Sequence, residues 1–385
     1  MTRIARAVDP EDLAAFTAAA MRALDGDGAL ALGVPEDLEV PDGIAVVIAT
    51  SGSTGVPKRV MLRAEALGAS ADATARRLAP DAAGGAQWML ALPAGYVAGL
   101  QVVVRSILAG TEPVHLDGRF APGSFVDATR AALRRRPDDG PLLTSLVPAQ
   151  LGTLLGAAAE GQRGLRSALA AYDAILIGGQ ALPEQLRDRA AAAGVRIVRT
   201  YGSSETSGGC VYDGVPLDDV RVQSVDGELR IAGPTLSDGY LGDPALTDEV
   251  FETDAEGVRW YRTGDLGIVE DGVVRVHGRA DNVIVSGGIN VSLDRVERIV
   301  RGVPGLTGAV VVATADARWG EASVIVAPRG EALRRSESEQ LRQAREAVAA
   351  EIGAHARPAR LVLVDELAML SSGKPDREAI RRLLG

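Results

Sequence analysis

"TSGSTGVPK", at residues 50–58, combines hydroxyls, glycines and a lysine directly after the apolar run 43–49, GIAVVIA. The apolar run predicts a buried strand. Hydroxyls and unhindered backbone N–H groups can surround phosphate oxygens, and a lysine adds a point charge. The segment is not the Walker A pattern, because two residues separate Gly55 from Lys58 and no Ser or Thr follows the lysine. On this segment alone, a plain Gly/Ser turn between a strand and a helix stays open.

The composition is that of a globular protein with more than one domain. The chain has 385 residues, 46% of them hydrophobic, and a formal net charge of −10. This length exceeds what a single core usually serves, and two or three domains are expected. The acidic balance argues against a nucleic-acid partner or an anionic membrane surface. Cys210 is the one cysteine, which excludes an internal disulfide, and three scattered histidines are too few for a zinc-type cluster.

The sequence predicts neither an export signal nor a membrane span. Residues 7–28 favour an acidic amphipathic helix, not a basic end followed by an apolar run. The charge-free run 84–104 contains a proline and several glycines, so we interpret it as a strand, a loop and the start of a helix. We therefore expect a cytoplasmic protein without stable membrane insertion.

The order of apolar and polar stretches predicts an α/β fold. Ala/Leu/Arg-rich helical stretches alternate with further apolar runs at 87–93, 142–148, 173–179 and 195–202. From about residue 220 short strands follow, joined by Asp-Gly turns that predict β-hairpins.

We expect a large N-terminal domain, 1–279, with a β-rich end, and a small α+β domain, 280–385. In the small domain we expect a helix at 292–301, a second helix from the capping box Ser336–Glu339, and strands at 308–314, 321–327 and 360–367.

Four more motifs follow the first in a fixed order: YGSSE at 201–205, YRTGDLG at 261–267, GRADNVIVSGG at 278–288 and SSGKPDR at 371–377. Together with 50–58 they resemble the phosphate loop, the YGxTE and TGD motifs, the hinge and the C-terminal lysine loop of the adenylate-forming acyl- and aryl-CoA synthetases. The resemblance covers nearly the whole chain. It implies the adenylate-forming fold with a small mobile C-terminal domain. It also implies a reaction in which a carboxylate attacks the α-phosphate of ATP, pyrophosphate leaves, and the thiol of CoA then displaces AMP.

The two lysines of the chain both lie inside these motifs. Lys and Arg together number 41, yet only Lys58 and Lys374 are lysines. An ammonium is a compact charge on a flexible stem, whereas a guanidinium is a bulky planar fork. A single ammonium can reach between a carboxylate oxygen and the α-phosphate as negative charge develops there. We expect Lys374 to be catalytic and Lys58 to contact phosphate; chance placement of both lysines is the alternative.

The resemblance also implies roles for carboxylates and hydroxyls. Glu205 would hold Mg²⁺, Thr206 would hydrogen-bond a phosphate, Tyr201 would pack against adenine, and Asp265 would hold both ribose hydroxyls. Taken alone, Glu205 fits a solvated turn and Asp265 a turn-stabilising aspartate. The expected ATP-binding residues are Thr50, Ser51, Gly52, Ser53, Thr54, Gly55, Lys58, Gly179, Tyr201, Gly202, Asp265 and Arg279.

The hinge motif implies a domain rotation about Asp281. In the family, this rotation brings the lysine loop to the site first and a glycine loop second. The matching glycine loop is Ser286, Gly287 and Gly288, where glycines would let the pantetheine arm of CoA pass close to the backbone.

The acid is suggested by LPAGYVAG at 92–99, in which Tyr96 replaces the histidine of the superfamily pattern LPxxHxxG. With 145–151 and 201–220, this region resembles the o-succinylbenzoate–CoA ligases of menaquinone biosynthesis in their short actinobacterial form. Such a substrate has two carboxylates. Arg105, on a predicted helix, could present a guanidinium fork to the benzoate carboxylate, and a surface-paired arginine is an equal alternative. The expected acid-site residues are Tyr96, Arg105, Ser203 and Ser204.

Other functions remain as alternatives. Within the same class, the acid could be another aryl or short-chain carboxylic acid. A P-loop phosphotransferase is disfavoured by the missing Walker A spacing, and a non-catalytic nucleotide-binding relative by the joint presence of Lys374, Glu205 and Asp265. The expected small molecules are ATP, Mg²⁺, CoA and o-succinylbenzoate, and a homodimer is left open.

Overall fold

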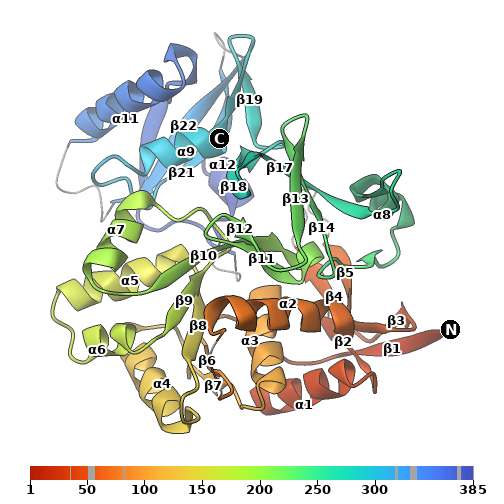
Figure 1. Ribbon diagram of the computed structural model, residues 1–385. Coiled ribbons are helices and arrows are strands. Elements are labelled where there is room, and N and C mark those ends of the chain that lie inside the picture. Colours follow the sequence, from red (N-terminus) through yellow and green to blue (C-terminus); the bar gives the residue numbers. More distant parts are fainter. Residues whose placement is uncertain are drawn as a thin grey trace.

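The computed structural model describes residues 1–34, 36–50, 57–80, 82, 84–316, 320–329, 336–370 and 374–384. Within them the chain forms four β-sheets, of which the last belongs to a separate C-terminal layer (Figure 1). The observed elements confirm the predicted α/β class with a β-rich stretch before the C-terminal part.

The first sheet has the strand order β15-β5-β4-β2-β1-β3. Its central strands β1, β2 and β4 are parallel, and β5 returns antiparallel to β4. The predicted strand at 43–49 is therefore confirmed. Thr50 at the end of β4 lies opposite Lys58 at the start of β5, so the two ends of the phosphate segment meet across this sheet. The strands are β1 (Thr2–Ala7), β2 (Ala29–Leu32), β3 (Leu38–Pro41), β4 (Ile44–Thr50), β5 (Lys58–Arg63) and β15 (Gly239–Tyr240).

The second sheet has the order β12-β11-β10-β9-β8-β6-β7, with β7, β6, β8, β9 and β10 parallel. The apolar runs predicted as strands form β6, β8, β9 and β10. In open parallel sheets, ligands bind beyond the carboxyl ends of the strands, so these ends mark the expected site. The strands are β6 (Gln87–Leu90), β7 (Val114–His115), β8 (Leu142–Leu146), β9 (Ala174–Ile177), β10 (Ile197–Ser203), β11 (Gly208–Tyr212) and β12 (Val215–Pro216).

Helices cover both faces of the second sheet (Figure 1). The helices α1, α2 and α3 share one apolar core with the first and second sheets, and α4 to α7 share another with the opposite face. Trp88 of β6 belongs to the first core and Met89 to the second, as the alternation of side chains along a strand requires. The helices are α1 (Leu13–Leu24), α2 (Ala64–Leu78), α3 (Val97–Leu108), α4 (Pro122–Arg135), α5 (Pro148–Ala159), α6 (Leu165–Ala170), α7 (Glu184–Ala192) and α8 (Pro244–Val250).

The third sheet contains the predicted hairpins. Asp226 and Gly227 join β13 to β14 with φ of 53° and 83°, and Asp271 and Gly272 join β17 to β18 with φ of 50° and 77°. Positive φ at both central residues is the turn that Asp-Gly favours in two-residue hairpins. The strands are β13 (Arg221–Val225), β14 (Glu228–Ala232), β16 (Phe251–Thr253), β17 (Arg259–Glu270) and β18 (Val273–Arg279).

The fourth sheet forms the C-terminal part with its own apolar core. The predicted second helix begins as expected, since Oγ of Ser336 accepts a hydrogen bond from the N–H of Glu339 at 3.3 Å. The third sheet ends at Arg279 and the fourth begins at Val283, and we place the proposed boundary between domains 1–279 and 280–385 in this segment. The elements are β19 (Val283–Ser286), β20 (Ile289–Ser292), α9 (Leu293–Val300), β21 (Val310–Asp316), β22 (Gly320–Pro328), α11 (Glu337–Glu351), β23 (Arg360–Val364) and α12 (Arg377–Arg382).

The long charge-free run follows its predicted division into β6, a loop and α3. In the part of the chain that the structure describes, no helix combines the length and the apolarity needed to cross a bilayer.

Candidate active site

A cleft of about 2390 Å³ runs between the sheets of the N-terminal part and the C-terminal layer. Its walls include the carboxyl ends of β8, β9 and β10, the hairpin β17–β18, and residues of α9 and α12. Thus the predicted ligand edge of the second sheet and the predicted lysine loop face the same space.

Glu205 lies on the wall of this cleft, in a short 3₁₀ turn (Ser204–Thr206) directly after β10. Its side chain is 8% exposed, and its Oε1 accepts a hydrogen bond of 2.9 Å from the hydroxyl of Tyr240. Burial and the nearby negative charge of Glu205 raise the pKa of Tyr240, so its hydroxyl stays a donor. Glu205 is therefore an oriented carboxylate, not one in a solvated turn.

Asp265 is held by two groups of the predicted nucleotide set. The hydroxyl of Tyr201 donates to Oδ2 at 2.6 Å, and Nη1 of Arg279 lies 3.4 Å from Oδ1. Burial raises the pKa of Asp265, whereas the Tyr201 hydrogen bond and the Arg279 charge act in the opposite direction. Tyr201 therefore does more than offer a ring face, because its hydroxyl fixes the orientation of the carboxylate.

Lys374 reaches the same cleft from the C-terminal layer. A Cβ built on Gly179, which has φ of +81°, would lie 3.8 Å from Cε of Lys374, so this glycine leaves the space that the lysine stem uses. Burial lowers the pKa of Lys374, although the charges of Glu205 and Asp265 raise it and that of Arg279 lowers it further. The side chain still faces the open cleft. The structure thus brings together Lys374, Glu205 and Asp265, which the sequence separates widely.

The phosphate segment is described only at its ends. Oγ1 of Thr50 donates to the carbonyl of Lys58 at 3.4 Å, and both residues line the cleft. Nζ of Lys58 lies 5.4 Å from the centre of the Tyr240 ring, within the range of a cation–π contact. Tyr240 therefore contacts Lys58 through its ring and Glu205 through its hydroxyl. The predicted phosphate residues Ser51, Gly52, Ser53, Thr54 and Gly55 lie outside the described residues.

The helix α3 carries the predicted acid-site residues into the cleft. Tyr96 is its N-cap residue, and Arg105, nine positions later, is only 6% exposed. Nη2 of Arg105 donates to the hydroxyl of Tyr212 at 3.3 Å, and its guanidinium lies 5.2 Å from the centre of the Trp88 ring. Nε of Arg105 has no hydrogen-bond partner among the described residues. The alternative of a surface-paired helix arginine is wrong, because this guanidinium is buried at the cleft wall.

The remaining residues predicted for the site differ in whether they line the cleft. The side chain of Thr206 is fully buried, does not line the cleft, and donates its hydroxyl to the carbonyl of Gly208 at 2.8 Å. Contrary to the expected phosphate contact, Thr206 closes the turn that presents Glu205, because its hydroxyl is committed to backbone groups. A Cβ on Gly202 would lie 2.1 Å from the same Gly208 carbonyl, so glycine is required there. Ser203 and Ser204 line the cleft beside Glu205.

The glycine loop expected to meet CoA lies away from the cleft. Oγ of Ser286 donates to the carbonyl of His355 at 3.1 Å, and Gly287 and Gly288 form the turn between β19 and β20 with φ of 60° and 81°. None of the three lines the cleft. In this arrangement Lys374, and not the glycine loop, lies in the site.

The expected hinge residue Asp281 is paired with Arg279. Its two carboxylate oxygens accept from Nε and Nη2 of Arg279 at 3.0 Å each. These hydrogen bonds hold the pKa of Asp281 below its ordinary value. Arg279 thus bridges Asp265 and Asp281, and so joins the nucleotide side of the cleft to the segment between the domains.

Tyr240 and Gln101 line the cleft and were not among the predicted site residues. The sequence offered one signal for Tyr240, an aromatic residue between Gly239 and Gly242. For Gln101, whose Nε2 donates to the carbonyl of Ser207 at 2.9 Å, no local signal existed because its partner is distant in sequence.

No group of three or more His, Cys, Asp or Glu side chains with metal-binding geometry occurs in the described ranges. A single carboxylate is nevertheless sufficient for Mg²⁺ when substrate phosphates supply the other oxygens. Glu205 fits that donor set.

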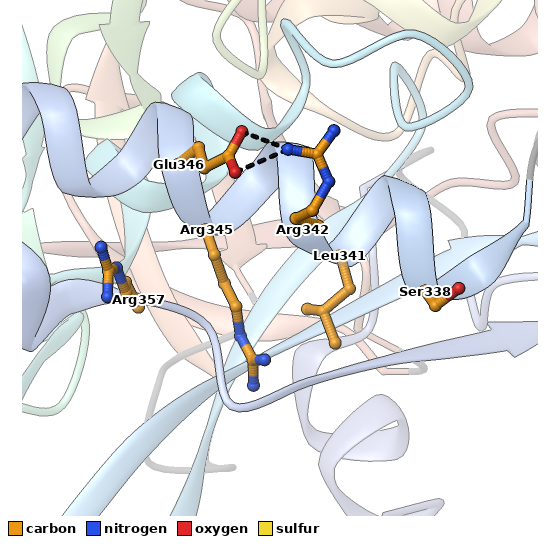
Figure 2. Close-up of a pocket in the computed structure, with 6 residues that line it drawn as sticks. All are labelled: Ser338, Leu341, Arg342, Arg345, Glu346 and Arg357. Atoms are coloured by element: carbon orange, nitrogen blue, oxygen red, sulfur yellow. Dashed lines mark hydrogen bonds and ion pairs between the residues drawn. The ribbon is translucent and has the colours of Figure 1, made fainter.

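A second pocket, of about 370 Å³, lies on the C-terminal part (Figure 2). Arg342 on α11 is paired with Glu346 at 2.6 Å, and Arg345 donates to the carbonyl of Pro358 at 2.8 Å. Arg342 and Arg345 thus already have partners within the protein. It shares no lining residue with the large cleft, and we assign it no part in the chemistry.

Comparison with known proteins gives this site a family context. Residues 5–241 match the model of the AMP-binding enzymes, and residues 295–374 match that of the AMP-binding enzyme C-terminal domain. A "Probable 2-succinylbenzoate–CoA ligase" of Mycobacterium tuberculosis (strain ATCC 25618 / H37Rv) is 41% identical over 90% of this chain and 86% of its own length. The 2-succinylbenzoate–CoA ligase of Salmonella typhimurium is 30% identical over 74% of this chain and 58% of its own length.

The solved structures agree with these relatives. A variant of Escherichia coli MenE with bound OSB-AMS superposes with a TM-score of 0.69 and 26% identity, covering 89% of this chain and 69% of that one. MenE from Bacillus subtilis in complex with the acyl-adenylate OSB-AMP has a TM-score of 0.72 over 90% of this chain and 71% of its own, at 24% identity, which supports the fold alone. The chain therefore belongs to the AMP-binding enzymes, with the adenylate-forming fold, and within them to the 2-succinylbenzoate–CoA ligase family.

Proposed function

We propose that this protein is an ATP-dependent, AMP-forming ligase that joins o-succinylbenzoate to CoA through an acyl-adenylate, and so supplies o-succinylbenzoyl-CoA for menaquinone biosynthesis. The observation that carries the proposal is a single cleft that holds Lys374, Glu205 and Asp265 at one side and the buried Arg105 at another. The relatives named above support the choice of acid.

The nucleotide would bind beside Asp265. Its carboxylate is oriented by Tyr201 and Arg279, and two oxygens on one rigid group suit the two hydroxyls of a ribose. Because Tyr201 stays protonated, it donates to Oδ2 of Asp265, and each carboxylate oxygen keeps a further lone pair that can accept from a ribose hydroxyl.

The phosphates would lie between the two lysines. Lys374 enters from the C-terminal layer and Lys58 from the first sheet, so their ammonium groups can approach the phosphate chain from different sides. Glu205 would hold Mg²⁺, which, when bound, neutralises phosphate charge. The contribution of the chain is positioning and charge stabilisation, as a developing pentavalent phosphorus requires.

The acid would enter along α3. The succinyl carboxylate would face the α-phosphate, and the benzoate carboxylate would meet the guanidinium of Arg105. An arginine at 6% exposure loses most of its hydration, so a carboxylate partner there gains more than it would at the surface. The free Nε of Arg105 supplies a donor for such a partner.

The second step requires access for the thiol of CoA. We propose that the C-terminal part rotates about Asp281 and brings Ser286, Gly287 and Gly288 to the cleft in place of Lys374. The position of these residues outside the cleft, while Lys374 lies in it, supports two alternating arrangements. We further propose that the enzyme acts in the cytoplasm.

The test is pyrophosphate release with ATP, Mg²⁺ and o-succinylbenzoate, with and without CoA, for the wild type and for Lys374→Ala. We expect release that depends on this acid and falls about a thousandfold in the variant, because one well-placed charge at the transition state contributes on this scale. Release with a different carboxylate, and none with o-succinylbenzoate, would retain adenylation but overturn the acid. Formation of ADP instead of AMP would overturn the reaction class.

A further inference from the structure

Residues 368–370 pair with residues 374–376 at the C-terminal end of the chain, and we call these paired residues the turn of Lys374. Met369 and Pro375 form an isolated β-bridge, and the N–H of Leu370 donates to the carbonyl of Lys374 at 2.8 Å. The N–H of Asp376 donates to the carbonyl of Ala368 at 2.8 Å. These contacts tie the two sides of the turn to each other, but they do not set its position against the rest of the C-terminal layer.

Leu367 and Ala368 pack against the apolar core of that layer, and Arg377, three residues after the lysine, adds a polar connection to it. It is the first residue of α12, which the side chain of Asp376 caps. Its Nη1 donates to the carbonyl of Val311 on β21 at 2.6 Å, and its Nη2 pairs with Oε2 of Glu297 on α9 at 2.7 Å. One planar fork thus binds two different elements, which a flexible ammonium could not do with the same geometry.

Glu297 is a buried and fully engaged partner. Its side chain is 8% exposed, its Oε2 also accepts from the N–H of Val311 at 2.9 Å, and its Oε1 pairs with Arg301 at 2.8 Å. Nε of Arg301 in turn donates to the carbonyl of Ala309 at 2.7 Å. A carboxylate held on this many sides offers Arg377 one position, in contrast to a surface ion pair between mobile side chains.

The same guanidinium also faces the segment between the domains. Nη2 of Arg377 lies 3.7 Å from Oδ1 of Asp294. Oδ2 of Asp294 accepts from the N–H of Arg279 at 2.8 Å, and its Oδ1 accepts from Nδ2 of Asn282 at 2.6 Å. Because Arg279 also contacts Asp265, a continuous series of polar contacts leads from the carboxylate of Asp265, which we propose binds the nucleotide, to Arg377 beside the turn of Lys374.

We propose that Arg377, seated on Glu297 and facing Asp294, is a positioning residue that fixes the turn of Lys374 in the cleft. This inference rests on the proposed adenylation function of Lys374. Arg377 acts through Lys374, and it has no contact of its own with the reacting atoms.

The expected effect of losing Arg377 follows from how strongly the rate depends on the position of a catalytic group. Misplacement of a reacting group by about 1 Å can lower a rate by roughly a hundredfold without weakening substrate binding. Replacement of Arg377 by Met keeps the length of the stem and removes the fork. We therefore expect kcat for adenylation to fall by roughly a hundredfold, while KM for ATP and for the acid changes by less than about threefold.

The two lysines allow a direct measurement that does not need activity. Reductive methylation with ¹³C-formaldehyde labels only Lys58, Lys374 and the terminal amine, and a Lys58→Arg variant assigns the signals. In Arg377→Met and Arg377→Gln we expect the Lys374 signal to shift and to narrow to the line of a freely mobile lysine side chain. The Lys58 signal should stay where it is in the wild type.

Arg295→Met is the matched control. Arg295 lies on α9, the helix that carries Glu297, and it follows Asp294 in the chain. Its side chain is exposed, donates to the carbonyl of Glu351 and does not line the cleft. It should change neither the Lys374 signal nor the rate. Arg377→Lys, assayed only by kinetics, should retain a rate between those of the wild type and Arg377→Met.

The outcomes separate the two levels of the proposal. If the Lys374 signal is unchanged in both Arg377 variants, or if KM rises as much as kcat falls, Arg377 does not position the lysine. A variant that does not fold would move both lysine signals to the position of a free lysine, and Asp294→Asn, which keeps the acceptor for Arg279 but removes the charge facing Arg377, then takes its place. If the wild type forms no acyl-adenylate while the Lys374 signal still moves, the proposed function fails and the positioning role stands.

Discussion

The hydroxyl of Tyr240 donates to Oε1 of Glu205 at 2.9 Å, and through this bond the edge of the first sheet holds the carboxylate that follows the second sheet. Nζ of Lys58 lies 5.4 Å from the centre of the ring of the same tyrosine. One phenol therefore sets the distance between the proposed metal carboxylate and the phosphate lysine. Tyr240 belongs to the first sheet and Glu205 follows the second, so this hydrogen bond fixes the relative position of residues from two separate parts of the chain.

Tyr240→Phe tests this relation. The change removes the donor and leaves a buried carboxylate oxygen without it, which should lower the free energy of unfolding by about 1–3 kcal/mol. The Mg²⁺ concentration that gives half-maximal pyrophosphate release should also rise, because the carboxylate is no longer oriented. Urea denaturation and a Mg²⁺ titration measure the two effects.

Tyr172→Phe serves as the control for Tyr240→Phe. Tyr172 shares a buried hydrogen bond of 2.9 Å with Thr129, on the other face of the second sheet. It should lower stability without changing the Mg²⁺ dependence. An equal shift of the Mg²⁺ dependence in both variants would contradict the assigned role of Tyr240.

Tyr201→Phe should weaken the binding of ATP and leave the binding of the acid unchanged. The variant keeps the ring face but loses the 2.6 Å hydrogen bond to Asp265. A hydrogen bond to a charged group contributes about 1.5–3 kcal/mol, so KM for ATP should rise roughly tenfold or more. Steady-state kinetics with each substrate varied in turn provides the measurement. A rise in KM for the acid of the same size would show that Asp265 does not serve the nucleotide.

The pH dependence of adenylation should reflect Lys374. Burial lowers the pKa of this ammonium below its ordinary value of about 10.4, against the opposing charges of Glu205 and Asp265 and with that of Arg279. The protonated form is the active one, so the rate should fall as pH rises through the lowered pKa. The rate of pyrophosphate release from pH 7 to pH 10.5 is the measurement.

Lys374 should also affect stability in the same pH window. Between the lowered pKa of the folded protein and the ordinary pKa of the unfolded chain, the unfolded chain binds more protons, so the lysine makes the free energy of unfolding rise with pH. Lys374→Met should lose this contribution. If the wild type and the variant have the same slope of stability against pH, the ammonium is not desolvated in solution.

Arg105→Ala should raise KM for o-succinylbenzoate by a hundredfold or more and leave KM for ATP nearly unchanged, since a buried charge-assisted contact contributes about 3 kcal/mol. The matched control is a substrate. With 4-oxo-4-phenylbutanoate, which lacks the ring carboxylate, the wild type and the variant should differ little. If the variant is impaired equally with both acids, Arg105 supports the fold of α3 and does not bind the carboxylate.

Much of the fold was predictable because its signals are local. The apolar runs became β4, β6, β8, β9 and β10, and the Asp-Gly pairs became hairpin turns with positive φ. The edge strand β3 and its neighbour β1 were not predicted, because their pairing partners, and not their own composition, make them strands. The charge and polarity of Arg105 likewise favoured the surface as much as the interior, and only packing against Trp88 and Tyr212 decided that it is buried.

The sequence by itself determined the family and its chemistry, because five motifs keep their order and because the two lysines of an arginine-rich chain both lie inside them. Only the tertiary structure decided which of these residues meet. Thr206 turned inward because its hydroxyl satisfies backbone groups, and Lys374 shares one cleft with Glu205, close to Arg377 and its buried partner Glu297 on another helix. Such contacts join residues far apart in the chain, and their energies depend on burial and distance, which no local pattern records.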